Sequence, residues 1–169
     1  MGAWLREERA ELAIDRLLDA AGEAFEEHGP QRARMEHVAR AARCSRGTLY
    51  RYFATREALE QAYVAREASR IGARIAERVA TLDAPADRLV EALRCAVAEV
   101  RARPTLAAWF APEAAGGTAR MALASAAVRE LAGGFLAELL ARASERGRLR
   151  PGVQADDATA WVVRVVLSL

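Results

Sequence analysis

The side chains best suited to chemistry lie in one short stretch near the end of the first third of the chain. Arg46 carries a guanidinium that can bind a guanine edge through two hydrogen bonds. Gly47 lets the backbone approach a phosphate closely, and the hydroxyls of Thr48, Tyr50 and Tyr52 are donors for phosphate oxygens. The two tyrosines could instead be core aromatics, but the arginines that flank them favour phosphate. The pattern indicates a surface that binds double-stranded DNA.

Two short helices joined by a tight turn are predicted to hold these side chains. Residues 35–42 place apolar side chains on one face at helical spacing. Arg43 and Cys44 break this pattern, and Ser45 is a suitable N-cap for a second helix over residues 46–52. Thr55 is expected to cap the next helix. A helix, a turn of three or four residues and a second helix form the helix-turn-helix arrangement.

This stretch resembles the TetR family of bacterial transcriptional regulators. The run Gly47-Thr48-Leu49-Tyr50 followed by Tyr52-Phe53 carries the resemblance, which covers about the first third of the chain. It implies that Arg46 and Thr48 face bases and that Tyr50 and Tyr52 contact phosphates. It also implies that Arg56 binds a phosphate at the start of the fourth helix.

Two residues depart from the family pattern. Arg43 stands in the turn where the family usually has glycine, and a positive φ there would cost on the order of 1 kcal/mol. Arg34 replaces the usual threonine cap of the second helix, which removes a side-chain cap worth roughly 1 kcal/mol. Arg34 is instead a candidate phosphate donor. The predicted DNA-binding residues are Arg34, Arg43, Ser45, Arg46, Gly47, Thr48, Tyr50, Tyr52 and Arg56.

Charge is distributed unevenly along the 169 residues, although the net charge is only +2. Residues 30–57 carry seven arginines and two acids, whereas residues 1–29 carry three arginines and eight acids. Concentrated positive charge in the helix-turn-helix is the footprint that DNA binding requires. The acids of the first helix are expected to face away from DNA, with Arg16 as the exception.

The sequence contains no pattern typical of an enzyme or a metal protein. We find no Ser-His-Asp arrangement, zinc-ligand spacing or phosphate-binding glycine loop, so we expect no catalytic residue, metal or cofactor. Two cysteines are too few for a disulfide framework. The charged N-terminus and the absence of a long apolar run predict neither a signal peptide nor a membrane span, and hence a cytoplasmic protein.

Helical periodicity continues to the end of the chain and predicts an all-α fold. The first helix is expected over residues 8–27, after Trp4 and Leu5, and a long fourth helix over 56–81. Further helices are expected over 85–101, from Pro104, over 118–145 and after Asp156-Asp157. We expect residues 1–55 to form a three-helix DNA-binding domain and residues 56–169 a helical domain for effector binding and dimerisation.

Two groups of apolar residues in the second domain have predicted roles. The candidate effector-pocket residues are Tyr63, Cys95, Trp109, Phe110 and Met121. The candidate homodimer residues are Phe135, Leu136, Leu139, Leu140, Trp161, Val162, Val165 and Val166. Plain core packing is the alternative for the pocket residues. The pair Gly133-Gly134 indicates either a kink or the close approach of another helix.

These observations favour a homodimeric regulator that binds a palindromic operator and is released as a repressor by a small-molecule effector. Dimers are expected because one helix-turn-helix buries little surface on DNA. Two alternatives remain open at this point. One is a constitutive DNA-binding regulator without an effector, and the other is a helical ligand-binding protein whose helix-turn-helix is only structural.

Overall fold

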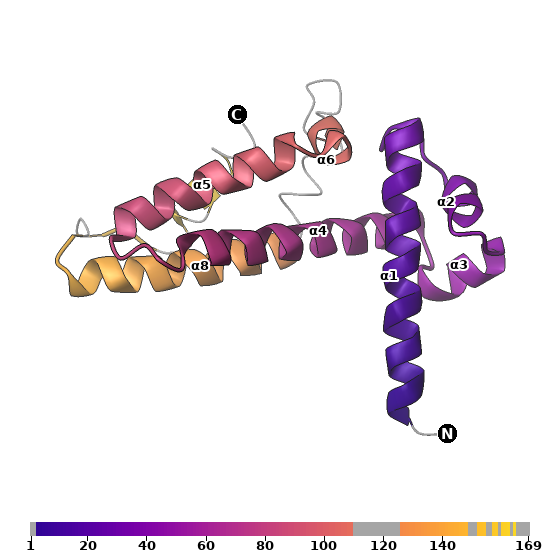
Figure 1. Ribbon diagram of the computed structural model, residues 1–169, viewed down its shortest axis with the longest axis horizontal. Helices are drawn as coiled ribbons and strands as arrows, with labels where there is room; N and C mark the ends of the chain where they lie inside the picture. The colour runs from indigo at the N-terminus through magenta and orange to yellow at the C-terminus, as the bar shows by residue number, and fades with distance from the viewer. Residues whose placement is uncertain are drawn as a thin grey trace. The chain divides into compact units, whose positions relative to one another are not determined.

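The computed structural model describes residues 3–109 and 126–148 together with positions 152–154, 157, 158, 160–162 and 164. Every regular element among these residues is a helix, which confirms the predicted all-α fold (Figure 1). The chain divides into two compact units, residues 1–64 and residues 65–169. None of the described helices combines the length and the apolar character needed to cross a bilayer.

The first unit contains three helices and the beginning of a fourth. They are α1 (Ala3–His28), α2 (Met35–Ala41), α3 (Arg46–Tyr52) and the first turns of α4 (Arg56–Val79). Helices α2 and α3 lie together on one side of α1 (Figure 1). The bounds of α3 are those predicted, and α2 ends one residue earlier than predicted.

Helix α1 begins at Ala3, so the prediction that it starts near Glu8 is wrong. Trp4 and Leu5 belong to the helix rather than preceding it. The cause is local, because the first residues of α1 are mainly arginine, glutamate, alanine and leucine, which are all good helix formers. The extension adds more than a turn of helix at the N-terminal end of the first unit.

The core of the first unit is formed by one apolar stripe from each helix. Its buried residues include Leu17, Leu18, Ala21, Phe25, Met35, Val38, Leu49, Phe53, Leu59 and Tyr63. Phe25 of α1 and Tyr63 of α4 meet edge to face, with ring centroids 5.2 Å apart. This geometry is favourable for aromatic pairs. Residues from the first two turns of α4 therefore complete the core on which the helix-turn-helix rests.

The second unit contains the rest of α4 together with α5 (Pro85–Arg101), α6 (Pro104–Trp109) and α8 (Ala126–Glu145). Pro85 occupies the first turn of α5, where its missing N–H costs nothing. Helix α8 ends at Glu145, and the turn that follows contains Gly147, whose φ of 61° suits a glycine. Residues 118–125 of the predicted helix over 118–145 lie outside the described part. The described positions 157, 158, 160–162 and 164 are helical, within the predicted last helix.

Ion pairs join the helices of the second unit. Arg74 of α4 lies 2.9 Å from Glu99 of α5, and Arg78 lies 2.8 Å from Glu91. Arg103, between α5 and α6, lies 3.4 Å from the buried carboxylate of Glu67. Most of these side chains are partly exposed, so we regard the pairs as fixing how the helices align rather than as a large source of stability.

Candidate nucleic-acid interface

The turn between α2 and α3 is built around Arg43, whose φ is +52°. The backbone N–H of Arg43 donates to the carbonyl of Arg40 at 3.0 Å, and that of Cys44 donates to the carbonyl of Ala39 at 3.0 Å. These two bonds form a Schellman motif, which satisfies the last carbonyls of α2. Arg43 thus has the positive φ considered for this position, a conformation that costs an arginine about 1 kcal/mol relative to glycine.

Helix α3 starts at the predicted cap. The Oγ of Ser45 accepts a hydrogen bond from the backbone N–H of Thr48 at 3.0 Å and lies 2.9 Å from the Thr48 hydroxyl. The Schellman turn and this cap together fix the direction in which α3 leaves α2. The side chain of Thr48 is half-buried, so it does not project freely from the outer face of α3.

The outer face of α3 presents the residues expected to read DNA. Arg46, Gly47 and Tyr50 are exposed, and 41% of the surface of Tyr50 is accessible. Tyr52 is half-buried and the guanidinium carbon of Arg51 lies 5.3 Å from the centre of its ring. The two predicted tyrosines therefore have different surroundings: Tyr50 is free to contact a partner, and Tyr52 is partly held by its neighbours.

The N-terminus of α2 lacks a side-chain cap from Arg34, as expected, but a different residue takes part of that role. The Nδ1 of His37 accepts a hydrogen bond from the backbone N–H of Arg34 at 3.2 Å. An arginine side chain has no acceptor, so only this half of a capping box can form. The imidazole of His37 also packs on that of His28 from α1, with ring centroids 3.9 Å apart.

Arg34 itself remains available to a partner. Its side chain is 78% exposed, and its Nη1 lies 3.8 Å from a carboxylate oxygen of Glu36. A long, exposed ion pair of this kind contributes little to stability and is readily exchanged for another anion.

The start of α4 uses Thr55 as its cap, as predicted. The Oγ1 of Thr55 accepts the backbone N–H of Ala58 at 3.1 Å. A hydrogen bond from its own backbone N–H, aided by the Thr55 hydroxyl, lowers the pKa of the Glu57 carboxyl below its ordinary value of 4.5. The ionised carboxylate is thus favoured in the first turn, where the helix dipole also favours an anion.

Arg56 has intramolecular partners that the sequence did not reveal. Its Nη2 donates to the carbonyl oxygens of Pro30 at 2.6 Å and Gln31 at 3.3 Å, and lies 2.7 Å from a carboxylate oxygen of Glu60. The guanidinium therefore ties the α1–α2 connection to α4. Its contact with phosphate stays a prediction, whereas its role inside the fold is a finding.

Glu60 is 7% exposed and was not singled out in the sequence. Burial raises the pKa of its carboxyl, and the neighbouring charge of Arg56 partly opposes that rise. The spacing of Arg56 and Glu60 along one helix, four residues apart, was the available signal for this pair.

Comparison with known proteins agrees with this geometry. The family model described as bacterial regulatory proteins of the tetR family matches residues 17–63, which span the helix-turn-helix and its supporting helices. An uncharacterized HTH-type transcriptional regulator of Mycobacterium tuberculosis H37Rv, Rv1255c, is 41% identical over 166 residues. That alignment covers 98% of this chain and 78% of the relative. The chain belongs to the TetR family. It is a TetR-type transcriptional regulator.

Other relatives share the N-terminal unit or the fold of TetR proteins. UidR of Escherichia coli K12 is 39% identical over 64 residues, which cover 38% of this chain and 33% of UidR. The structure of RolR in complex with resorcinol has a TM-score of 0.76 at 22% identity, with coverage of 96% of this chain and 78% of RolR. FadR of Bacillus subtilis, solved with stearoyl-CoA, has a TM-score of 0.73 at 16% identity, with coverage of 90% and 82%. These two structures support the TetR fold for both units.

The predicted effector-pocket residues do not share one environment in this TetR-family chain. Tyr63 is buried against Phe25 in the first unit, and its part in an effector pocket stays a prediction. Cys95 is buried in α5, where burial raises the pKa of its thiol. Trp109 is the last residue of α6, and Phe110 and Met121 lie outside the described residues.

The predicted dimer residues fall into two groups. Leu136 and Leu139 are 3% and 6% exposed in the single chain, so they pack in its own core, and their part in a dimer stays a prediction. Phe135, Leu140 and Val162 are half-buried, and Trp161 is 59% exposed. Val165 and Val166 lie outside the described residues.

Proposed function

We propose that this regulator is a homodimeric repressor that binds an operator through α3 and is released by a small-molecule effector bound in its second unit. The observation that carries the proposal is the outer face of α3. Arg46, Gly47 and Tyr50 are exposed there, on a helix whose direction is fixed by the turn at Arg43 and the cap at Ser45. A rigid helix with exposed guanidinium and hydroxyl donors suits the major groove.

Support for an effector comes from proteins of the same fold. RolR was solved with resorcinol, B. subtilis FadR with stearoyl-CoA, and AibR with isovaleryl coenzyme A and operator DNA. Such partners differ widely in size and charge, so we propose effector-released repression without assigning a ligand. Under this proposal the chain has no catalytic role, and it acts in the cytoplasm, where bacterial operator DNA is found.

Support for a dimer comes from the surface of the second unit. Trp161 is exposed, and a Cβ added at Gly133 or Gly134 would meet no described atom within 4 Å. No helix from the described part of this chain therefore packs closely against the glycine pair. A second subunit related by a two-fold axis would use this space and would match a palindromic operator.

The proposal is tested in two stages. Selection from a random duplex library should enrich a palindrome, and the enriched duplex should bind at least 10³-fold more tightly than scrambled DNA at physiological salt, by the usual ratio for specific binding. A library that yields no enriched sequence would contradict sequence-specific DNA binding.

The second stage concerns the effector. Candidate acyl-CoA and phenolic ligands are screened by thermal shift. A ligand that raises the melting temperature should also release the operator, and stabilisation without release would contradict the effector mechanism.

A further inference from the structure

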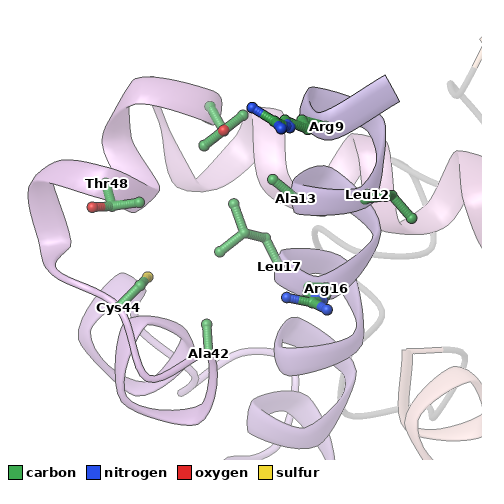
Figure 2. Close-up of a pocket in the computed structure, with 9 residues that line it drawn as sticks. Arg9, Leu12, Ala13, Arg16, Leu17, Ala42, Cys44 and Thr48 are labelled. Atoms are coloured by element: carbon green, nitrogen blue, oxygen red, sulfur yellow. The ribbon is translucent and has the colours of Figure 1, made fainter. Parts of the chain in front are cut away.

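A surface groove of about 330 Å³ lies between α1, the α2–α3 turn and α3 (Figure 2). Leu17 points into it from α1, and Ala42, Cys44 and Thr48 line its other side (Figure 2). The remaining lining residues are Arg9, Leu12, Ala13, Arg16 and Tyr52. Two guanidiniums, two hydroxyls and a thiol thus surround an apolar floor, and no lining residue is acidic.

The two arginines lie on one face of α1, although α1 is acidic as a whole. Arg9 and Arg16 are seven residues apart, so they differ by only about 20° around the helix at 100° per residue. The acids of the same helical segment are Glu7, Glu8, Glu11 and Asp15. By the same rotation they fall about 100° or more from Arg9. These four acids therefore lie on other faces of α1 than Arg9, although the exposed Asp19 lies only about 60° around the helix from Arg16.

Arg9 and Arg16 differ from Arg74 and Arg78 of the second unit in having no ion-pair partner among the described residues. Both are exposed, and neither forms an ion pair or hydrogen bond with any residue in the described part of the chain. In the second unit, by contrast, Arg74 and Arg78 each lie within 3 Å of a carboxylate. Two guanidiniums without a partner among the described residues share this groove with the hydroxyls of Thr48 and Tyr52 and form a surface complementary to an anion.

The groove is also continuous with the proposed DNA-reading helix. Thr48 and Tyr52 belong to α3, whose outer face exposes Arg46 and Tyr50. A DNA strand that follows the edge of the major groove beside α3 carries a phosphate at every nucleotide, and arginine and hydroxyl groups are the usual ligands of such phosphates. The apolar floor provides contact for the sugars between them.

We propose that the sugar-phosphate backbone of the operator lies along this groove and that Arg9 and Arg16 of α1 bind its phosphates opposite Thr48 and Tyr52. The proposal rests on the proposed function, because it assumes operator binding through α3. It assigns to α1 a direct part in holding DNA, in addition to its support of the helix-turn-helix. The two arginines position the duplex and carry no base specificity.

The test compares the full-length protein with the double variant Arg9→Gln/Arg16→Gln by fluorescence anisotropy over a range of salt concentrations. A plot of log binding constant against log salt concentration has a negative slope. Loss of two phosphate contacts should make this slope shallower by about 1.8 and weaken binding about tenfold or more at 0.1 M salt. Scrambled DNA should weaken by a similar factor, which leaves the specificity ratio unchanged. Arg94→Gln, an exposed arginine of α5, is the matched control and should leave the slope as in the wild type.

A second variant separates charge from packing. Arg9→Lys/Arg16→Lys should keep most of the slope, because lysine still binds phosphate as a point charge. An unchanged slope in the glutamine variant, or a selective loss of operator over scrambled DNA, would overturn the proposal. Failure of the wild-type protein to prefer any operator would instead overturn the proposed function, so the two failures are distinguishable.

Discussion

The guanidinium of Arg56 lies 2.7 Å from the carboxylate of Glu60, one turn further along α4. The same guanidinium donates to the carbonyl of Pro30, 26 residues earlier in the chain. One ion pair thus holds the entry to the helix-turn-helix against the helix that follows it. Because Glu60 is buried, the pair links the geometry of this DNA-binding unit to the ionisation of a single carboxyl.

Stability of the first unit should therefore depend on pH through Glu60. Its folded pKa is raised by burial above the ordinary 4.5, so the folded state binds the proton more readily than the unfolded state does. The stabilising contribution is fully present below pH 4.5 and is lost as the pH rises through the folded pKa. Urea unfolding at several pH values should show Glu60→Gln gaining stability relative to the wild type as the pH increases. A stability difference independent of pH would contradict this assignment.

Removal of the His37 side chain should destabilise α2. His37→Ala removes the acceptor for the backbone N–H of Arg34 and should lower the free energy of unfolding by about 1 kcal/mol. His37→Gln is the matched control, because glutamine is a usual capping-box residue at this position and supplies an acceptor. Chemical denaturation measures both variants. Equal losses in both would show that packing on His28, rather than the cap, is what matters.

A trade-off between folding and binding is expected at Arg43. Arg43→Gly relieves the positive φ and should raise the free energy of unfolding by about 1 kcal/mol. If Arg43 contacts phosphate, the same change removes one ionic contact. The dependence of log binding constant on log salt concentration should then become shallower by about 0.9. Arg43→Asn tolerates the same conformation without the charge. Its slope should match that of the glycine variant, and a slope equal to that of the wild type would exclude a phosphate contact.

Arg46 and Tyr50 should affect DNA binding in different ways. Arg46→Ala should cost about 1–3 kcal/mol on the operator and less on scrambled DNA, because a base contact is lost. Tyr50→Phe should weaken both DNAs alike without changing the melting temperature, because its exposed hydroxyl is expected to contact phosphate. Competition binding with both duplexes measures each variant. Equal losses of Arg46→Ala on both duplexes would show that Arg46 holds only phosphate.

The dimer is best tested at Trp161, which is exposed in the single chain. Trp161→Glu should shift sedimentation from dimer to monomer and weaken operator binding, while the helical circular dichroism signal is retained. Leu139→Ala is a core control and should lower the free energy of unfolding by about 2–5 kcal/mol. A Trp161→Glu protein that stays dimeric would place the interface elsewhere.

Local sequence signals were sufficient to predict the helix-turn-helix. Ser45 and Thr55 form the predicted caps, and the break at Arg43 marks the turn, because each depends on residues only a few positions away. The contact of Arg56 with Pro30 and the stacking of His28 on His37 were not predicted. Both join segments that are distant in sequence, and periodicity within one helix carries no information about them.

The same limit applies to the second unit. The apolar spacing of α8 marked Leu136 and Leu139 as residues that must be covered, but it could not say whether the chain itself or a second copy would cover them. Tyr63 was assigned by its position on α4, whereas its burial depends on Phe25 of another helix. Arg16 was expected to be an exception on an acidic helix, but Arg9 and the groove beside α3 were not predicted, because the negative net charge of that helix gave no signal for them.

The compact first unit ends at Val64, inside α4, rather than before that helix. An engineer who wishes to graft these operator contacts onto another regulator should therefore cut within α4. A fragment that stops at residue 55 would lack Leu59 and Tyr63 and leave hydrophobic side chains without cover. The splice would also have to respect helical phase, since insertion or deletion of one residue rotates everything beyond it by about 100°. A functional chimera therefore requires the right helical phase at the junction in α4 as well as the right pair of units.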